Sequence, residues 1–195
     1  MRERPSRGLR GARCIRCRAN LDACVCDVIA TLPTLRVPSP VHLLLHPGES
    51  EKSTNTGWLA TQLLEGRVTI VGRDLPEPVL PAGTLLLTPD ATRVLSARDT
   101  GTPLAAIDAA WKPARRLRRK IASLRNLDAV ALPEGAIGRF ALRHVAREGH
   151  VSTAEALALA MGVLGAPETE EALLQVFDAF VTRNLRVRGQ QASSE

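Results

Sequence analysis

Short apolar runs recur along the chain between residues 41 and 132. Within each run, polar and apolar positions do not alternate, which is typical of parallel strands buried on both faces of a sheet. The runs predict strands at 41–46, 67–72, 84–88, 104–108 and 129–132.

Helical patterns separate these strands and continue beyond the last of them. Helices are predicted at 54–65, 90–97, 113–124, 152–164 and 168–186. Ser152 followed by Glu155 has the form of a capping box, which supports a helix start at that point. Because strands and helices alternate, the pattern predicts an α/β fold: a mostly parallel sheet with helices on both faces.

The length and composition fit one main domain with short appendages. The chain has 195 residues, of which 45% are hydrophobic and 24% charged, as in ordinary globular proteins. We expect a basic flexible arm at 1–13, a cysteine-rich segment at 14–32, an α/β domain at 38–188 and a mobile polar tail at 189–195.

Neither a membrane span nor a secretory signal is expected. The longest apolar run, residues 156–167, contains two glycines and is too short to cross a bilayer. The arginine-rich N-terminus is not followed by an apolar stretch, as it would be in a signal peptide. We therefore expect a cytoplasmic protein with no membrane partner.

All the cysteines are confined to one short segment, where they follow the spacing C-x2-C-x6-C-x-C. Four thiolates so close in sequence suit a closed tetrahedral Zn²⁺ site of the structural kind. Disulfides are the alternative, which the absence of an export signal disfavours. His42 and His46 are alternative metal ligands. The predicted ligands are Cys14, Cys17, Cys24 and Cys26.

The net charge of +6 is concentrated in two places. Residues 1–18 carry seven arginines against the single acidic residue Glu3. The second cluster, with no acidic neighbour, is Lys112, Arg115, Arg116, Arg118, Arg119, Lys120 and Arg125. Such clusters indicate a polyanion partner, and the alternative is a solvated helix face plus a frayed terminus. With few aromatic residues and no tyrosine, a base-stacking platform for single strands is not expected.

Polar and glycine residues follow several of the predicted strands. Ligands of open α/β sheets bind at the carboxyl ends of the strands. The segments in question are 46–49, 54–57, 88–90, 108–111, 132–135 and 152–156. None of them matches a nucleotide phosphate-binding loop, which disfavours nucleoside triphosphates and dinucleotide cofactors.

Asp108 is the clearest candidate for a catalytic residue. It ends an apolar strand close to Trp111, and partial burial would make its carboxylate a better base. The alternative is that Asp108 only caps the arginine-rich helix that follows.

Taken together, these motifs resemble the DTW-domain family over about residues 14–164. The residues that carry the resemblance are the cysteine cluster, His46-Pro-x-Glu49, Asn55-Thr-Gly57, Asp108-x-x-Trp111, Leu132-Pro-Glu-Gly135 and Ser152-Thr-x-Glu155-Ala156. The resemblance implies a tRNA-uridine aminocarboxypropyltransferase, with a fold related to the knotted, SPOUT-like RNA methyltransferases. The donor would be S-adenosylmethionine, and the 3-amino-3-carboxypropyl group would move to N3 of a uridine in tRNA.

The resemblance also implies roles for individual residues. Asp108 would be the base that removes the N3 proton. The expected donor-binding residues are Asn55, Thr56, Leu132, Pro133, Glu134, Gly135, Thr153 and Glu155. The expected substrate or RNA contacts are Trp111, Arg115, Arg116, Arg119, Lys120, Arg139 and Arg143, the last two of which suit either the donor carboxylate or an RNA phosphate.

Two residues depart from the family pattern. Ala110 stands where the family usually has a hydroxyl residue before the tryptophan, and Phe140 stands where tyrosine is expected. Two other functions remain open: a knotted RNA methyltransferase, and a zinc-dependent RNA-binding module without catalysis. Ribosomal RNA is an alternative acceptor, DNA is not an expected partner, and the protein is expected to be a monomer or a homodimer.

Overall fold

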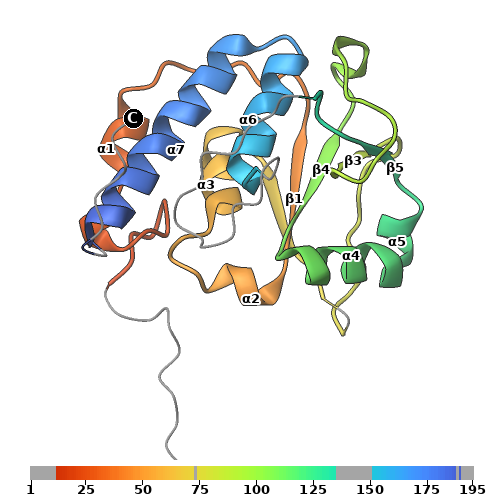
Figure 1. Ribbon diagram of the computed structural model, residues 1–195, viewed down its shortest axis with the longest axis horizontal. Helices are drawn as coiled ribbons and strands as arrows, with labels where there is room; N and C mark the ends of the chain where they lie inside the picture. The colour runs from red at the N-terminus through yellow and green to blue at the C-terminus, as the bar shows by residue number, and fades with distance from the viewer. Residues whose placement is uncertain (1–11, 73, 135–150, 188, 190–195) are drawn as a thin grey trace, which may run out of the picture.

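Five parallel strands form a single sheet in the order β2-β1-β4-β3-β5 (Figure 1). The computed structural model describes residues 12–72, 74–134, 151–187 and 189. The strands are β1 (Val41–Leu45), β2 (Arg67–Ile70), β3 (Leu85–Leu87), β4 (Leu104–Asp108) and β5 (Asp128–Val130). Every predicted strand is present, with its ends within two residues of the predicted ones.

Seven α-helices and two short 3-10 helices accompany the strands in the described part of the chain. They are η1 (Leu21–Ala23), α1 (Cys26–Ala30), α2 (Pro47–Ser50), α3 (Thr56–Leu63), η2 (Ala97–Asp99), α4 (Trp111–Lys120), α5 (Ala122–Arg125), α6 (Thr153–Val163) and α7 (Pro167–Val187). The predicted helices at 54–65, 152–164 and 168–186 are confirmed as α3, α6 and α7. The one predicted at 113–124 is divided into α4 and α5 by the extended backbone of Ile121.

The prediction of a helix at 90–97 is wrong. This stretch pairs with the chain beyond β5: the Leu95 N–H donates to the Ala131 carbonyl, and the Ala131 N–H donates to the Arg93 carbonyl. A parallel bridge joins Val94 to Ala131. Backbone groups used in this pairing are not available for helical hydrogen bonds. Between β3 and β4, a stretch that the structure describes throughout, the only helix is the short η2.

Helices cover both faces of the sheet, as predicted. The helices α3, α6 and α7 lie together on one face (Figure 1). They pack on side chains such as Val41 and Ala106 around the large buried ring of Phe177. On the other face, Leu117 of α4 and Leu124 of α5 pack against residues of the inner strands. The alternation of strands and helices along the chain therefore builds a layered α/β fold.

Burial differs between the inner and the edge strands. All residues of β1 and β3 are buried, as the unbroken apolar runs predict. The expectation of burial on both faces is wrong for β2, where Arg67 and Ile70 are exposed. As the edge strand, β2 pairs only with β1.

The cysteine-rich segment packs into the core of the α/β domain. Cys17, Ala19, Ala23 and Val25 belong to the same buried cluster as α3, α6 and α7. Among the described residues, no helix combines the length and the apolar character needed to cross a bilayer. Most of the arm expected at 1–13 and of the tail expected at 189–195 lies outside the described residues, namely 1–11 and 190–195. The stretch 135–150 between β5 and α6 lies outside them as well, so the implied knot is not assigned.

Candidate functional site

Asp108 lies at the carboxyl end of β4, where two helices begin. Its side chain is almost fully buried, with 4% of the residue exposed. The Asn55 Nδ2 donates to Asp108 Oδ2 at 2.5 Å, and the Thr153 hydroxyl donates to Asp108 Oδ1 at 2.8 Å. Asn55 precedes α3 and Thr153 is the first residue of α6, so the partially positive N-termini of both helices are close to this carboxylate.

The close approach of α3 to Asp108 requires a glycine. A Cβ atom on Gly57 would lie 2.6 Å from Asp108 Oδ2 and 3.0 Å from Leu43 Cδ1. Contacts this short are not tolerated between a methyl group and a fixed carboxylate. Gly57 was not among the predicted site residues, although the polar-glycine run at 54–57 marked its position.

Asn55 caps α3 and holds Asp108, and it is not among the residues that line the cavity described below. Its Oδ1 accepts a hydrogen bond from the Trp58 N–H at 2.7 Å and so caps α3, while its Nδ2 holds Asp108. Thr56, the first residue of α3, is buried. The structure therefore places these two predicted donor-binding residues in the buried surroundings of the Asp108 carboxylate and not at an open surface.

The capping box predicted at the start of α6 is confirmed. The Ser152 N–H donates to Glu155 Oε2 at 2.7 Å, and the Glu155 N–H donates to Ser152 Oγ at 3.3 Å. Glu155 is 2% exposed, and it takes part in this capping box.

A cavity of about 390 Å³ opens at the carboxyl ends of β3, β4 and β5. Apolar residues such as Leu87, Ile107 and Ala131 line most of it. Six of the predicted site residues border the cavity, namely Trp111, Arg115, Leu132, Pro133, Glu134 and Thr153. A volume of this size suits a small organic ligand. The predicted residues Gly135, Arg139 and Arg143 lie outside the described part of the chain.

Thr153 connects the cavity to Asp108, because its side chain borders the cavity and donates to the carboxylate. Trp111, the first residue of α4, is 43% exposed at the cavity wall. Ala110, the N-cap of α4, makes no side-chain capping bond. The hydroxyl residue expected before this tryptophan from the family pattern is a preferred N-cap type, so its absence leaves the helix start without such a cap.

A second hollow, of about 960 Å³, runs along α4 and is called here the basic groove. The structure brings four predicted RNA contacts together in it, namely Arg115, Arg116, Arg119 and Lys120. His46, which follows β1, and Lys112 also line the groove, although neither was among the predicted RNA contacts. Arg115 lines the cavity as well as the groove, so the two hollows meet at this residue.

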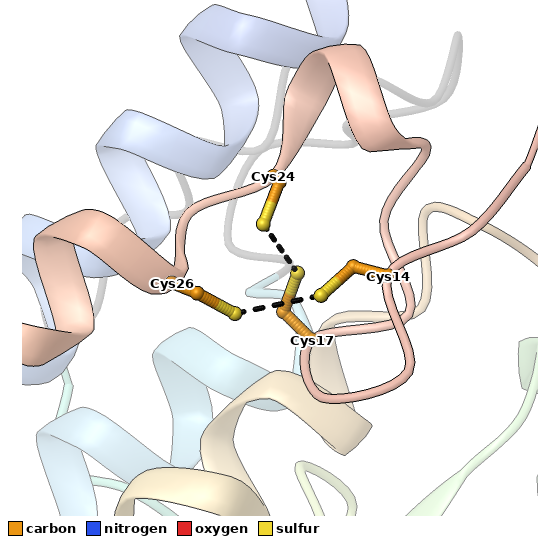
Figure 2. A group of neighbouring side chains, drawn as sticks. All are labelled: Cys14, Cys17, Cys24 and Cys26. Carbon is orange, nitrogen blue, oxygen red and sulfur yellow. Dashed lines mark hydrogen bonds between the residues drawn. The ribbon is translucent and has the colours of Figure 1, made fainter.

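The four cysteine sulfurs converge on one point between the loops that carry them (Figure 2). The Sγ atoms of Cys14 and Cys26 are 3.5 Å apart, those of Cys17 and Cys24 are 3.8 Å apart, and all four lie within 4.8 Å of one another. A tetrahedral Zn²⁺ with bonds of about 2.3 Å requires sulfurs separated by about 3.8 Å. The donor set therefore fits a zinc ion, and the four sulfurs belong to the cysteines that the sequence predicts as ligands.

The environment changes the acidity of these thiols unequally. A hydrogen bond from the Cys17 backbone N–H lowers the pKa of Cys14 to about 6. Burial raises the pKa of Cys26 to about 12, and it raises the pKa of Cys17 as well. Because a metal binds thiolates, metal loading would release protons from the more buried thiols.

The cysteine segment is fixed to α3 through Trp58. The indole Nε1 donates to the Arg16 carbonyl at 3.0 Å, and the guanidinium of Arg18 lies 3.4 Å from the centre of the Trp58 ring. On its other side, Arg183 of α7 donates to both carboxylate oxygens of Asp27, at 2.6 and 2.7 Å. The Trp58 N–H also donates to Asn55 Oδ1, so the cysteine segment is linked to the start of α3, where Asn55 holds Asp108.

A comparison with protein families agrees with this arrangement. The family model described as the DTW domain matches residues 11–185, a stretch that includes the cysteine cluster, the whole sheet and most of α7. The match covers most of the 195 residues and bears out the resemblance stated from the sequence motifs. The chain therefore belongs to the DTW-domain family.

Proposed function

We propose that the protein transfers the 3-amino-3-carboxypropyl group of S-adenosylmethionine to N3 of a uridine in tRNA and releases methylthioadenosine. Membership in the DTW-domain family is consistent with a tRNA-modifying enzyme. The observation that supports the specific site most strongly is Thr153, which borders the ligand-sized cavity and donates to the buried carboxylate of Asp108.

The proposed reaction is a displacement at carbon. N3 of uridine attacks the terminal carbon of the propyl chain, and the bond between that carbon and the sulfonium sulfur breaks. The bonding pair stays on sulfur, which becomes the neutral thioether of methylthioadenosine. The N3 proton leaves, so the positive charge of the sulfonium is balanced by the released proton. Positioning selects this carbon over the two others on sulfur.

Asp108 is the proposed acceptor of the N3 proton. Uridine N3 is protonated at neutral pH and becomes a good nucleophile only when that proton is removed. Thr153 stands between the carboxylate and the cavity, so its hydroxyl can take the proton from N3 while passing its own to Asp108 Oδ1. Asn55 holds the second oxygen and fixes the orientation of the carboxylate.

The apolar cavity is the proposed donor site. The adenosine end would contact the turn at Leu132 and Pro133, close to Thr153. Trp111 lies on the cavity wall and offers a partly exposed ring to either the donor or the target base. The target uridine has to leave the RNA stack to reach this site, which is least costly in a loop.

The basic groove is the proposed binding surface for the tRNA backbone. Its cationic side chains neutralise phosphates and carry no base information. Arg115, which borders both hollows, places this surface next to the donor cavity. A bound backbone would therefore pass close to the reacting atoms.

Zinc would have a structural role in this scheme. Cys14, Cys17, Cys24 and Cys26 would hold it, and the ion would supply binding free energy to the fold of the segment. The segment in turn supports α3 through Trp58.

Nucleoside analysis tests the proposal directly. Purified protein is incubated with unmodified tRNA and S-adenosylmethionine, and both the tRNA nucleosides and the released small nucleoside are identified by mass spectrometry. We expect aminocarboxypropyluridine together with methylthioadenosine. Adenosylhomocysteine with a methylated nucleoside would identify a methyltransferase, and tRNA binding without any product would identify a non-catalytic RNA-binding module. Ribosomal RNA in a parallel reaction identifies the acceptor.

A further inference from the structure

The charged side chains that line the donor cavity are few. Among the described lining residues they are Asp90, Arg115, Arg118 and Glu134, and most of the remaining wall is apolar. Asp90 follows the carboxyl end of β3, and the two arginines are on α4. A ligand in this cavity thus meets two carboxylates and two guanidinium groups beside an apolar surface.

Asp90 and the arginines form a compact charged group. Asp90 Oδ1 lies 3.3 Å from Arg118 Nη1, and Asp90 Oδ2 lies 3.7 Å from Arg115 Nε. The Thr88 hydroxyl donates to Asp90 Oδ1 at 2.5 Å. This hydrogen bond, with the nearby charges of Arg118 and Arg115, lowers the pKa of Asp90, so the carboxyl is ionised at neutral pH.

These ion pairs are easily opened by a ligand. The side chain of Asp90 is 36% exposed and that of Arg118 is 30% exposed. Exposed ion pairs contribute little to stability, because water solvates the separated charges almost as well. A ligand that offers each charge a new partner can therefore replace them at small cost.

We propose that Asp90 binds the α-ammonium group and Arg118 the α-carboxylate of the amino-acid end of the donor. This inference rests on the proposed function and deepens it by assigning a subsite. An ammonium group has three donors and suits the carboxylate of Asp90, while the planar fork of a guanidinium suits a carboxylate. Both ligand groups are attached to the same carbon atom, so they require a cation and an anion side by side.

The arrangement favours a zwitterion over an RNA phosphate. A phosphate near Arg118 would also lie near the negative charge of Asp90, which repels it. The part of the basic groove at Arg116 and Lys120, where no acidic residue is among the described lining side chains, is the better phosphate site. Asp90 thus separates the amino-acid subsite from the RNA surface.

Such a subsite would help to choose the bond that breaks. With adenosine held in the apolar part and the amino-acid end held by Asp90 and Arg118, the donor is fixed on both sides of the propyl chain. The terminal carbon of that chain is then presented at a fixed place for attack by N3.

Calorimetric titration with three ligands tests the subsite without turnover. S-Adenosylmethionine and adenosylhomocysteine carry the amino-acid end, methylthioadenosine lacks it, and only the first has a sulfonium charge. For Asp90→Asn we expect a loss of roughly tenfold in affinity for both amino-acid ligands and an unchanged affinity for methylthioadenosine. Arg118→Gln should give the same pattern. Asp128→Asn is the matched control, because Asp128 is an exposed residue at the amino end of β5, whereas the cavity lies at the carboxyl ends of the strands.

Each other pattern overturns the subsite. Equal losses for all three ligands would place Asp90 against the nucleoside, and a loss confined to S-adenosylmethionine would place it against the sulfonium. Unchanged affinities would remove it from the donor site. These three results leave the proposed function standing, whereas a wild-type protein that binds none of the ligands would refute the donor assignment itself. Thermal melting of each variant checks that it is folded.

Discussion

Gly57 in α3 lies against the carboxylate of Asp108 so closely that a Cβ on this glycine would be 2.6 Å from Oδ2. The contact joins the first turn of α3 to the end of β4, two elements separated by about a quarter of the chain. It allows Asn55 to reach the same oxygen and Thr153 to reach the other one. The buried carboxylate is thus enclosed by backbone and side chains that hold it in one orientation.

Gly57→Ala should therefore destabilise the protein and displace Asp108. Overpacking of a buried site costs about 1 to 3 kcal/mol, which exceeds the gain of up to about 1 kcal/mol in helix propensity. Chemical denaturation measures the difference. Gly72→Ala is the control, since the nearest atom to its Cβ would be a Leu75 methyl at 3.3 Å. Equal stability of the Gly57 variant and wild type would show that α3 can move away from the carboxylate.

Asp108→Asn should remove turnover and leave tRNA affinity nearly unchanged. An amide of the same shape keeps the packing but cannot accept the N3 proton, and removal of a general base lowers rates by about 10²- to 10⁴-fold. Single-turnover product formation and filter binding measure the two properties on one preparation. Turnover near the wild-type rate would refute the assignment of Asp108 as the base.

Arg116→Glu combined with Arg119→Glu should weaken tRNA binding and flatten its dependence on salt. Each phosphate that the variant no longer neutralises lowers the slope of log affinity against log salt by roughly 0.7 to 0.9. Titrations at several salt concentrations give the slope. Arg67→Glu combined with Arg98→Glu controls for net charge, because both arginines are exposed, neither lines the groove, and the double reversal changes the charge by the same amount. A slope equal to that of wild type would place the RNA elsewhere.

Ala110→Thr should stabilise the protein by about 0.5 to 2 kcal/mol, because a hydroxyl at the N-cap can accept a hydrogen bond from the first turn of α4. Ala110→Val has nearly the same shape without the hydroxyl and should give no such gain. Denaturation of the two variants side by side isolates the capping bond. If valine stabilises as much as threonine, packing and not capping is responsible.

Removal of zinc should unfold the cysteine segment and expose Trp58. Structural zinc contributes on the order of 10 kcal/mol to small zinc domains, which is comparable with the total stability of a typical domain. The background variant Trp111→Phe leaves Trp58 as the single tryptophan, so its fluorescence reports the contact with Arg18. We expect one zinc per chain by elemental analysis, and a red-shifted emission with a lower melting temperature after chelation. Metal-free protein with unchanged emission and melting would contradict a structural role.

Much of the fold follows from local patterns in the sequence. The apolar runs identify the strands, because each run is read from neighbouring positions. The capping box at Ser152 and Glu155 is confirmed for the same reason, since its partners are three residues apart. The wrong helix prediction at 90–97 shows where local patterns are insufficient. The composition there permits a helix, but the backbone forms hydrogen bonds with Ala131 in its place.

By itself, the sequence determined the parallel α/β architecture and the group of four cysteines that could hold a metal ion. These features depend on periodicity and spacing within short stretches. Only the tertiary structure decided which side chains surround Asp108, because Asn55 and Thr153 are 53 and 45 residues away from it along the chain. It also decided that Asp90 meets Arg118 at the cavity. Contacts over such separations are fixed by the stacking of α3, α4 and α6 on the sheet, and no local pattern encodes them.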